Sequence, residues 1–458
     1  MTLSLYDTLS RSVKPITSLN GCTRMYCCGP TVYRDAHVGN LRTFMLSDLI
    51  RRTIEISGGK VELIQNITDV GHMSEDVADQ DKMLSQAKVE KKDPFEIARM
   101  YEESFHKDLA LLNIKIAELY PRASESIDLM ISMINELIVE GFAYIGSDRC
   151  VYFDAQSFES YGQISGNRLD ALKPGHRFEY SDEDGKHFHA DWALWKNAGK
   201  RTQMVWDSPW GMGFPGWHIE CSAMSMKFLN RHINVHVGGI DLRFPHHENE
   251  RAQSNAFAGS ETVDLWVHGE HLLFEGRKMS KSAGNVILIS DVISRGLDPL
   301  AVRLNFLENR YRSQMDLTWA SIESADLRLS KLRKKMQLWG DSLESQIDEE
   351  FLAAMEGDLD APRALQRLRT IEKSADFSDA DKRARFIYAD KVLALDLNRT
   401  IDAKTISPIQ QELLDAREIA RKQKRWSESD TLRAQLEATG LEIKDGPTGQ
   451  EWSWLSRK

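Results

Sequence analysis

The feature that most constrains the fold of this chain is a strand, turn, helix and strand pattern near its N-terminus. From about Arg24, MYCCGPTVY reads as a strand, HVGN as a glycine-containing turn, and the next stretch, apolar at Phe44, Leu46, Leu49 and Ile50, as a helix. KVELIQNIT reads as a second strand. Such a βαβ unit requires a parallel sheet, which binds ligands at the carboxyl ends of its strands. We therefore predict an α/β fold.

A second half of the sheet begins near Ile233, where INVHVGGIDLRF again runs from a strand into a glycine turn. Between the two halves lie a charged helical stretch from about Pro94 and a mixed segment, rich in Gly, Asp and His, that ends near Lys200. We predict a Rossmann-type parallel-sheet catalytic domain formed by residues 1–93 and 201–318, with an inserted segment at 94–200.

Strand signals fade after Thr318. Segments such as ESADLRLSKLRKKMQLW and DAPRALQRLRTIEKSA have the spacing of amphipathic helices, which predicts a helical bundle over residues 319–406. Two further helices within AREIARKQKRWSESDTLRAQL predict a small C-terminal domain at 407–458.

Charge and composition narrow the possible functions. With 69 acidic and 59 basic residues the net charge is -10, so contacts with RNA must come from local basic patches. No apolar run reaches membrane length and the N-terminal residues lack the apolar core of a secretory signal, so we expect a cytoplasmic protein outside the membrane. In a reducing cytosol, the five cysteines favour metal binding or packing over disulfides.

Four residues that are far apart in the sequence have side chains that zinc prefers. Cys28 ends the first strand, Cys221 lies in GWHIECSAM, and FPHHENE supplies His246 and Glu250, which share one helix face at a spacing of four. Other residues compete as ligands by type: His218, His236, His247 and Cys150. A buried cysteine with a helix-surface histidine pair is the structural alternative.

The turn in PTVYRDAHVGN places His37, Gly39 and Asn40 at the start of the predicted helix. Gly39 lets the backbone approach a ligand, and the N–H groups of a helix N-terminus favour phosphate. Neutral side-chain donors there can stabilise the charge that develops in nucleotidyl transfer. Taken alone, a glycine turn with a histidine is more often only a turn.

A small basic loop, GRKMSKSAGN, occupies residues 276–285 after an apolar strand-like stretch. Lys278 and Lys281 can neutralise a triphosphate in a transition state, and Gly276 and Gly284 permit loop motion. A charge cluster alone would indicate a solvated loop, but the exact five-residue string KMSKS is a highly specific sequence motif.

Together, the H-x-G-x turn and a KMSKS string more than two hundred residues later resemble the class I aminoacyl-tRNA synthetases. The strings CGPTVY, NITDVGHM, DSPWGMGFPGWHIECSAM and GGIDLRFPHHENERAQS closely resemble the cysteinyl-tRNA synthetase family. This resemblance runs from about Leu5 to the C-terminus, thins after Thr318 and returns in AREIARKQKRWSESDTLRAQL.

The resemblance implies a set of site residues. Zinc ligands fall on Cys28, Cys221, His246 and Glu250, and Trp217 matches the aromatic residue at the base of the cysteine pocket. Positions around the adenylate and its adenosine and ribose match Gly29, Thr31, Asn66, Thr68, Gly239 and Asp241. The catalytic positions match His37, Asn40, Lys278 and Lys281, and ATP binding falls on His37, Asn40 and Lys281. The turn reads H-V-G-N where the family has H-I-G-H, so Asn40 offers an amide donor in place of an imidazole.

The activity implied by the resemblance is ATP-dependent activation of L-cysteine and its transfer to tRNA(Cys), with one zinc ion per chain and magnesium accompanying ATP. Residues 407–458 would recognise the anticodon, and we expect a monomer. One alternative is a ligase that transfers cysteine to a small amine, as in mycothiol synthesis; the helical tail argues against it. Another is a non-catalytic zinc- and RNA-binding paralogue, against which the intact KMSKS string and zinc positions argue.

Overall fold

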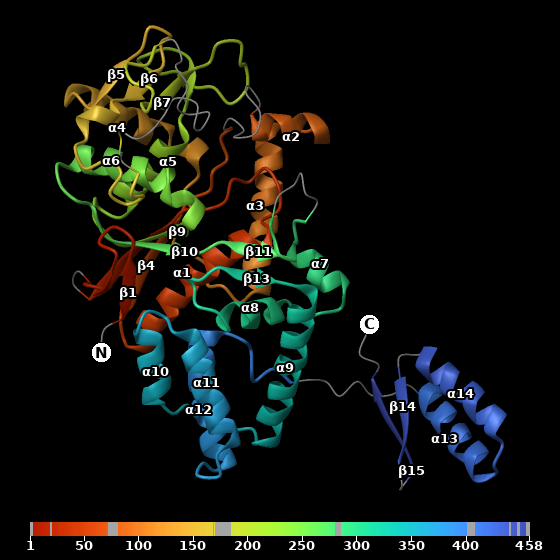
Figure 1. Cartoon of the computed structure of the whole chain (residues 1–458). Coiled ribbons are helices and arrows are strands. Elements are labelled where there is room, and N and C mark those ends of the chain that lie inside the picture. Colours follow the sequence, from red (N-terminus) through yellow and green to blue (C-terminus); the bar gives the residue numbers. More distant parts are fainter. Residues whose placement is uncertain are drawn as a thin grey trace. The chain divides into compact units, whose positions relative to one another are not determined.

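The computed structural model describes residues 3–18, 21–71, 81–167, 169, 185–279, 285–400, 408–438, 441–446 and 449–454. The chain divides into two compact units, Met1–Arg399 and Thr400–Lys458 (Figure 1). Lys281 and the domain boundary predicted at 406/407 lie outside the described residues.

A parallel sheet with the strand order β10-β9-β3-β4 forms the centre of the first unit. Its strands are β3 (Cys22–Cys27), β4 (Lys60–Gln65), β9 (Ile233–Gly239) and β10 (Val263–Gly269), and all neighbours run parallel. Every residue of β9 is buried, as expected for a strand covered on both faces. The predicted Rossmann-type sheet, assembled from two distant halves of the sequence, is confirmed.

Helix α1 (Val38–Ile56) connects β3 to β4. Its N-terminus is closed by a capping box, in which His37 Nδ1 accepts from the Asn40 N–H at 3.2 Å and Asn40 Oδ1 accepts from the His37 N–H at 3.3 Å. Leu41, Met45 and Leu49 pack into the core beneath the sheet. The crossover therefore delivers the helix N-terminus to the carboxyl edge of β3.

The chain leaves the parallel sheet after β4 and returns to it at β9. The intervening elements are α2 (Lys82–Glu90), α3 (Pro94–Leu111), α4 (Ile127–Val139), the antiparallel strands β5 (Ala143–Ile145), β6 (Val151–Phe153), β7 (Trp192–Asn197) and β8 (Gly213–Pro215), and α5 (Trp217–Phe228). The rings of Phe153 and Trp192 stack at 4.5 Å in the core of this part. The antiparallel sheet thus extends beyond Lys200 to Pro215.

Beyond β9, the short 3₁₀ turn η5 (Ile240–Arg243) leads into α6 (His246–Ala258), which packs on α5. Every residue of α6 from His246 to Ala256 is buried, although most of these residues are polar. The remaining elements around the sheet are β1 (Ser4–Asp7), β2 (Ser12–Pro15), β11 (Leu272–Phe274), β12 (Arg277–Lys278), β13 (Met315–Leu317), α7 (Ile289–Ser294) and α8 (Pro299–Leu307). Polar residues on a fully buried helix must be partnered or bind something, so α6 is a candidate functional element.

The helices predicted after Thr318 are α9 (Trp319–Leu338), α10 (Glu349–Glu356), α11 (Ala361–Lys373) and α12 (Asp379–Leu393). Thr318, Asp348, Asp360 and Ser378 cap them, each accepting a backbone N–H at its helix N-terminus. α12 contacts α1 and α9 packs on α8, so these helices belong to the first unit (Figure 1).

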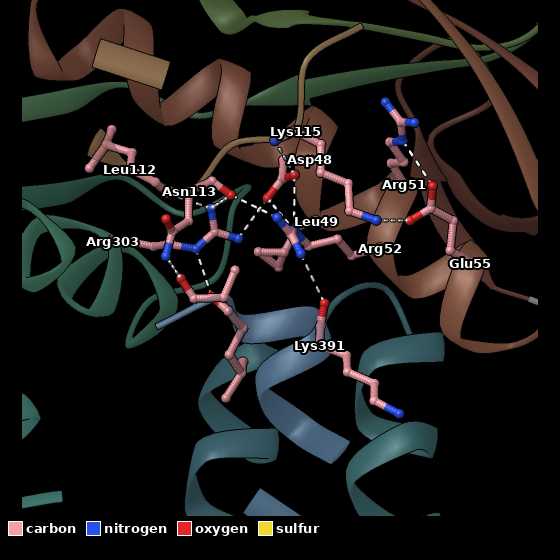
Figure 2. Close-up of polar contacts among 12 residues, drawn as sticks. Asp48, Leu49, Arg51, Arg52, Glu55, Leu112, Asn113, Lys115, Arg303 and Lys391 are labelled. Carbon is pink, nitrogen blue, oxygen red and sulfur yellow. Dashed lines mark hydrogen bonds and ion pairs between the residues drawn. The ribbon is translucent and has the colours of Figure 1, made fainter. Parts of the chain in front are cut away.

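A buried ion pair joins these helices to the middle of α1 (Figure 2). The Arg303 guanidinium donates to Asp48 at 2.6 Å, and both side chains have no exposed surface. Arg303 also donates to the carbonyl oxygens of Leu393 and Leu112. Because the charges are paired and further hydrogen-bonded, this site holds α1, α8 and α12 together.

The second unit contains α13 (Pro408–Lys422), α14 (Trp426–Ala438) and the hairpin of β14 (Leu441–Gly446) and β15 (Gly449–Trp454). Among its described residues, Leu414, Leu436, Leu441 and Ile443 form a buried apolar cluster. Of the helices in the described parts of both units, none combines the length and the apolar character needed to cross a bilayer.

Candidate functional site

The four candidate zinc ligands meet at one buried point between the sheet and α5 and α6. Cys28 follows β3, Cys221 lies in α5, and His246 and Glu250 lie one turn apart on α6. Their candidate ligand atoms all lie within 4.8 Å of one another. Cys28 Sγ is 4.0 Å from Cys221 Sγ and 3.4 Å from Glu250 Oε1, and His246 Nε2 is 2.8 Å from Glu250 Oε1.

A second possible ligand set overlaps the first: Cys28, His236, His247 and Glu250. The Cys28 sulfur is 3.5 Å from His236 Nε2 and 3.4 Å from His247 Nε2. Within the described residues, neither His218 nor Cys150 joins a group of three or more candidate ligands. Two of the competing ligands therefore lie at the site, and both groups share Cys28 and Glu250.

Burial and the neighbouring ligands together determine the pKa values in the set that contains Cys221 and His246. Burial alone lowers the pKa of His246, but the adjacent Glu250 carboxylate and the Cys221 sulfur raise it to about 10. A hydrogen bond from Cys28 lowers the pKa of Cys221, whereas burial raises that of Cys28. Glu250 Oε2 is buried and has no hydrogen-bond partner among the described residues. A thiophilic divalent cation would be coordinated by these sulfur, nitrogen and oxygen atoms, so the ligand set fits zinc.

Neutral histidines lie behind the ligands. His247 Nδ1 is 2.8 Å from His268 Nε2, and His268 Nδ1 is 2.8 Å from the Thr8 hydroxyl. Burial lowers the pKa of His236 to about 4 and that of His268 to about 3. His268 was not anticipated from the sequence; the available signal is a histidine inside each of two buried strands, INVHVGG and VDLWVHG.

Several expected substrate-binding residues form one hydrogen-bonded chain beside Cys221. The Gly29 N–H donates to Asn66 Oδ1 at 2.9 Å, and the Asn66 amide donates to the Thr68 hydroxyl at 3.1 Å. That hydroxyl donates to Glu220 at 3.1 Å. A Cβ at Gly29 would lie 1.6 Å from the Asn66 carbonyl oxygen, so only glycine fits.

Two other predicted substrate-binding residues adjoin this series of hydrogen bonds. Thr31 forms a parallel β-bridge with Thr68. The Trp217 ring, at the first residue of α5, lies 4.3 Å from the His246 ring, centroid to centroid. The structure thus brings Gly29, Thr31, Asn66, Thr68 and Trp217 to the ligand cluster.

The H-x-G-x turn lies at the carboxyl edge of the same sheet. Burial, followed by the charge of Arg34, lowers the pKa of His37 to about 4, so the imidazole is neutral at pH 7. Asn40 is exposed, and because its oxygen is used in the capping box, its amide N–H₂ is the group that can donate to a ligand. Gly239 ends β9, and a Cβ there would lie 2.3 Å from Asp241 Oδ1, whose charge also acts on His37.

The basic loop begins at the tip of a hairpin next to this turn. Lys278 is exposed in β12, and its carbonyl oxygen accepts from the Asn285 amide at 3.1 Å. A Cβ on Gly39 would lie 2.8 Å from Met279 Cε, so the turn and the described start of the KMSKS string are in contact. Lys281 is not among the residues that the structure describes.

Solved structures with a related fold include a Mycobacterium tuberculosis methionyl-tRNA synthetase bound to methionyl-adenylate, with 14% identity and a TM-score of 0.52 over 81% of this chain and 88% of the other. A LeuRS–tRNA–LeuAMS complex from Agrobacterium radiobacter gives 10% identity and a TM-score of 0.60 over 82% and 84%. At such identities the likeness concerns the fold alone.

Sequence comparison is more specific. Residues 15–327 match the family described as tRNA synthetases class I (C) catalytic domain, and residues 404–452 match the cysteinyl-tRNA ligase anticodon binding domain. A cysteine–tRNA ligase of Thermus thermophilus is 38% identical over 481 residues, 99% of each chain. Cysteine–tRNA ligase 1 of Burkholderia lata is 40% identical over 462 residues, 98% of this chain and 96% of the other. The predicted family is confirmed, and the chain belongs to the cysteine–tRNA ligases among the class I tRNA synthetases.

Proposed function

We propose that this protein activates L-cysteine with ATP to form cysteinyl-adenylate and transfers the cysteinyl group to the 3′ end of tRNA(Cys). The single observation that carries this proposal is the convergence of two cysteines, a histidine and a glutamate beside the chain of Gly29, Asn66 and Thr68. A buried thiol-rich metal centre next to a nucleotide-binding edge suits an enzyme that must recognise a thiol before adenylating its carboxylate.

The proposed zinc ligands are Cys28, Cys221, His246 and Glu250. This set supplies two thiolates, which zinc favours, whereas the overlapping set supplies one. When bound, zinc would supply a soft Lewis acid that bonds to the cysteine thiolate and lowers the thiol pKa. Packing alone separates cysteine from serine by about 1 to 3 kcal/mol, and about 10⁴-fold selection requires about 5.5 kcal/mol. Coordination of the cysteine thiolate by the metal would supply the remaining selectivity, so no hydrolytic editing site would be needed.

The nucleotide side of the site is assigned to the H-x-G-x turn and the KMSKS string. The neutral His37 and the amide N–H₂ of the exposed Asn40 would donate to ATP as charge develops on its phosphates. Gly239 and Asp241 would hold adenosine and ribose, and Lys278 with Lys281 would neutralise the leaving pyrophosphate. Magnesium would accompany ATP.

The acceptor is tRNA rather than a small amine because residues 404–452 match an anticodon-binding family. The second unit would read the anticodon, the chain would act as a monomer, and the reaction would take place in the cytoplasm. The division predicted from the sequence is a catalytic region of residues 1–93 and 201–318, with 94–200 inserted, 319–406 as a bundle and 407–458 as the anticodon-binding domain. Because β8 pairs with β7, the inserted part would continue to Pro215.

Exchange of ATP and pyrophosphate tests the first half of the reaction. The zinc-loaded protein should catalyse exchange with cysteine and show at least about 10⁴-fold lower efficiency with serine. Addition of tRNA(Cys) should then yield cysteinyl-tRNA. Exchange without charging would favour a small-amine acceptor, and the absence of exchange would remove the enzymatic proposal.

A further inference from the structure

Arg42 lies in the second turn of α1 and is only 5% exposed. Its guanidinium donates to five backbone carbonyl oxygens, those of Glu270 (2.8 Å), His271 (3.2 Å), Arg310 (3.2 Å), Tyr311 (3.5 Å) and Ser313 (2.9 Å). Burial lowers the pKa of Arg42 to about 10, which still leaves it charged at neutral pH. Because its hydrogen bonds go to main-chain oxygens, this side chain fixes the path of the backbone.

The acceptors belong to two segments that support the same small sheet. Glu270 and His271 lie between β10 and β11, directly before the β11–β12 hairpin that carries Lys278. The segment 310–313 precedes β13, which pairs in parallel with β11. One guanidinium therefore ties α1 to both segments that enter this three-stranded sheet.

Further contacts connect the start of the same helix to this hairpin and to the chain beyond it. The Val38 N–H donates to the Ile287 carbonyl oxygen at 3.0 Å. Gly39 lies against Met279, whose Cε would be 2.8 Å from a Cβ at that position. The hairpin thus touches the H-x-G-x turn through Met279, which directly follows β12, and is bound to α1 through the Arg42 contacts directly before β11.

We propose that Arg42 is a positioning residue that fixes the β11–β12 hairpin relative to the H-x-G-x turn, so that Lys278 and Asn40 are aimed at one nucleotide. The inference deepens, and rests on, the adenylation activity proposed above. Lysine in place of Arg42 keeps the charge, but its ammonium has three donors at one point and no planar fork, so it cannot reproduce the five carbonyl contacts on the two segments.

The test compares Arg42→Lys with Arg333→Lys. Arg333, on α9, is 4% exposed and donates to the carbonyl oxygens of Leu395 and Asp396 and to Asp298, so it is a buried, backbone-binding arginine outside α1. Both variants should lower the unfolding temperature. Only Arg42→Lys should lower kcat for cysteine-dependent exchange of ATP and pyrophosphate, by about 10- to 100-fold, because small misplacements of reacting groups are costly. Its zinc content and KM for cysteine should stay at wild-type values.

Wild-type kcat in Arg42→Lys, or an equal loss in Arg333→Lys, would overturn the inference. A loss of zinc or of cysteine affinity together with kcat would also overturn it, because that pattern indicates general distortion. If Arg42→Lys does not fold, Arg42→Gln is measured as folded, zinc-loaded protein, with the same loss expected and the same outcomes against it. Absence of exchange in the wild type would instead contradict the proposed function.

Discussion

The ligand cluster and the C-terminal unit differ in how far apart in the sequence their contacts lie. The cluster joins Cys28, which directly follows a sheet strand, to Cys221 and Glu250 on two later helices. In the C-terminal unit, by contrast, each element packs on its neighbour in the sequence: α13 on α14, α14 on β14 and β14 on β15. The cluster therefore depends on the whole parallel sheet, whereas the C-terminal unit depends mainly on local contacts.

The two regions also differ in what holds them together. The cluster is surrounded by a buried core that includes Tyr26, Trp266 and the histidines of β9 and β10. Among the described residues of the C-terminal unit, the apolar core cluster has four buried members, and the buried Arg417 pairs with Asp445 and Gln450. A small core limits stability, so substitutions there should act on that unit and leave the cluster intact.

The largest effect is expected from Cys221→Ser, which removes a thiolate from the cluster. A hydroxyl does not replace a thiolate as a zinc ligand, so the variant should lose its zinc and its preference for cysteine over serine. Elemental analysis and exchange with each amino acid measure both. Full zinc content with normal cysteine affinity would falsify the ligand assignment.

Comparison of the two neighbouring histidines sharpens the same point. His246→Ala should lose zinc, whereas His247→Ala should retain it, because His247 belongs only to the overlapping set. If the metal is lost from His247→Ala alone, Cys28, His236, His247 and Glu250 are the ligands.

Removal of the C-terminal unit should separate the two regions functionally. A chain ending at Ile406 should keep cysteine-dependent exchange of ATP and pyrophosphate, because the described ligand cluster and nucleotide side lie entirely in the first unit. It should lose most of its transfer to tRNA, since Trp426 is 58% exposed and available for stacking on bases. Undiminished charging by the truncated chain would show that the unit does not read the anticodon.

Asn40→Ala should have an intermediate effect on the first unit. Loss of one donor aimed at developing charge should slow exchange by about one to two orders of magnitude, or about 1.4 to 2.7 kcal/mol. Part of any stability change would come from the capping box, so the unfolding temperature is measured alongside the rate. Equal rates in the variant and the wild type would take this amide out of the mechanism.

The smallest effect on adenylation is expected from Leu436→Ala in the C-terminal core. Leu436 is fully buried, so loss of its side chain should destabilise that unit by about 2 kcal/mol or more. Exchange should remain at the wild-type rate while transfer to tRNA weakens at elevated temperature. A matching fall in exchange would show that the two regions are not independent.

Much of the architecture could be predicted from local patterns. The βαβ unit at β3, α1 and β4, the return of the sheet at β9 and the helices after Thr318 all have strong periodicity and turn residues. The end of the inserted antiparallel sheet is harder to predict from the sequence, because β8 is only three residues long and pairs with β7 across an irregular segment. Short strands are recognised by their partners rather than by their own sequence.

The chemical types at the site, two thiols, an imidazole and a carboxylate, can be read from the amino-acid sequence, as can the H-x-G-x and KMSKS strings that mark the family. The folded chain adds that His236 and His247 also reach Cys28, that His268 lies behind them, and that Arg42 ties α1 to the segment before the β11–β12 hairpin. These contacts are absent from the local pattern because ligand distances and guanidinium–carbonyl hydrogen bonds depend on how distant strands and helices pack. No local periodicity encodes that packing.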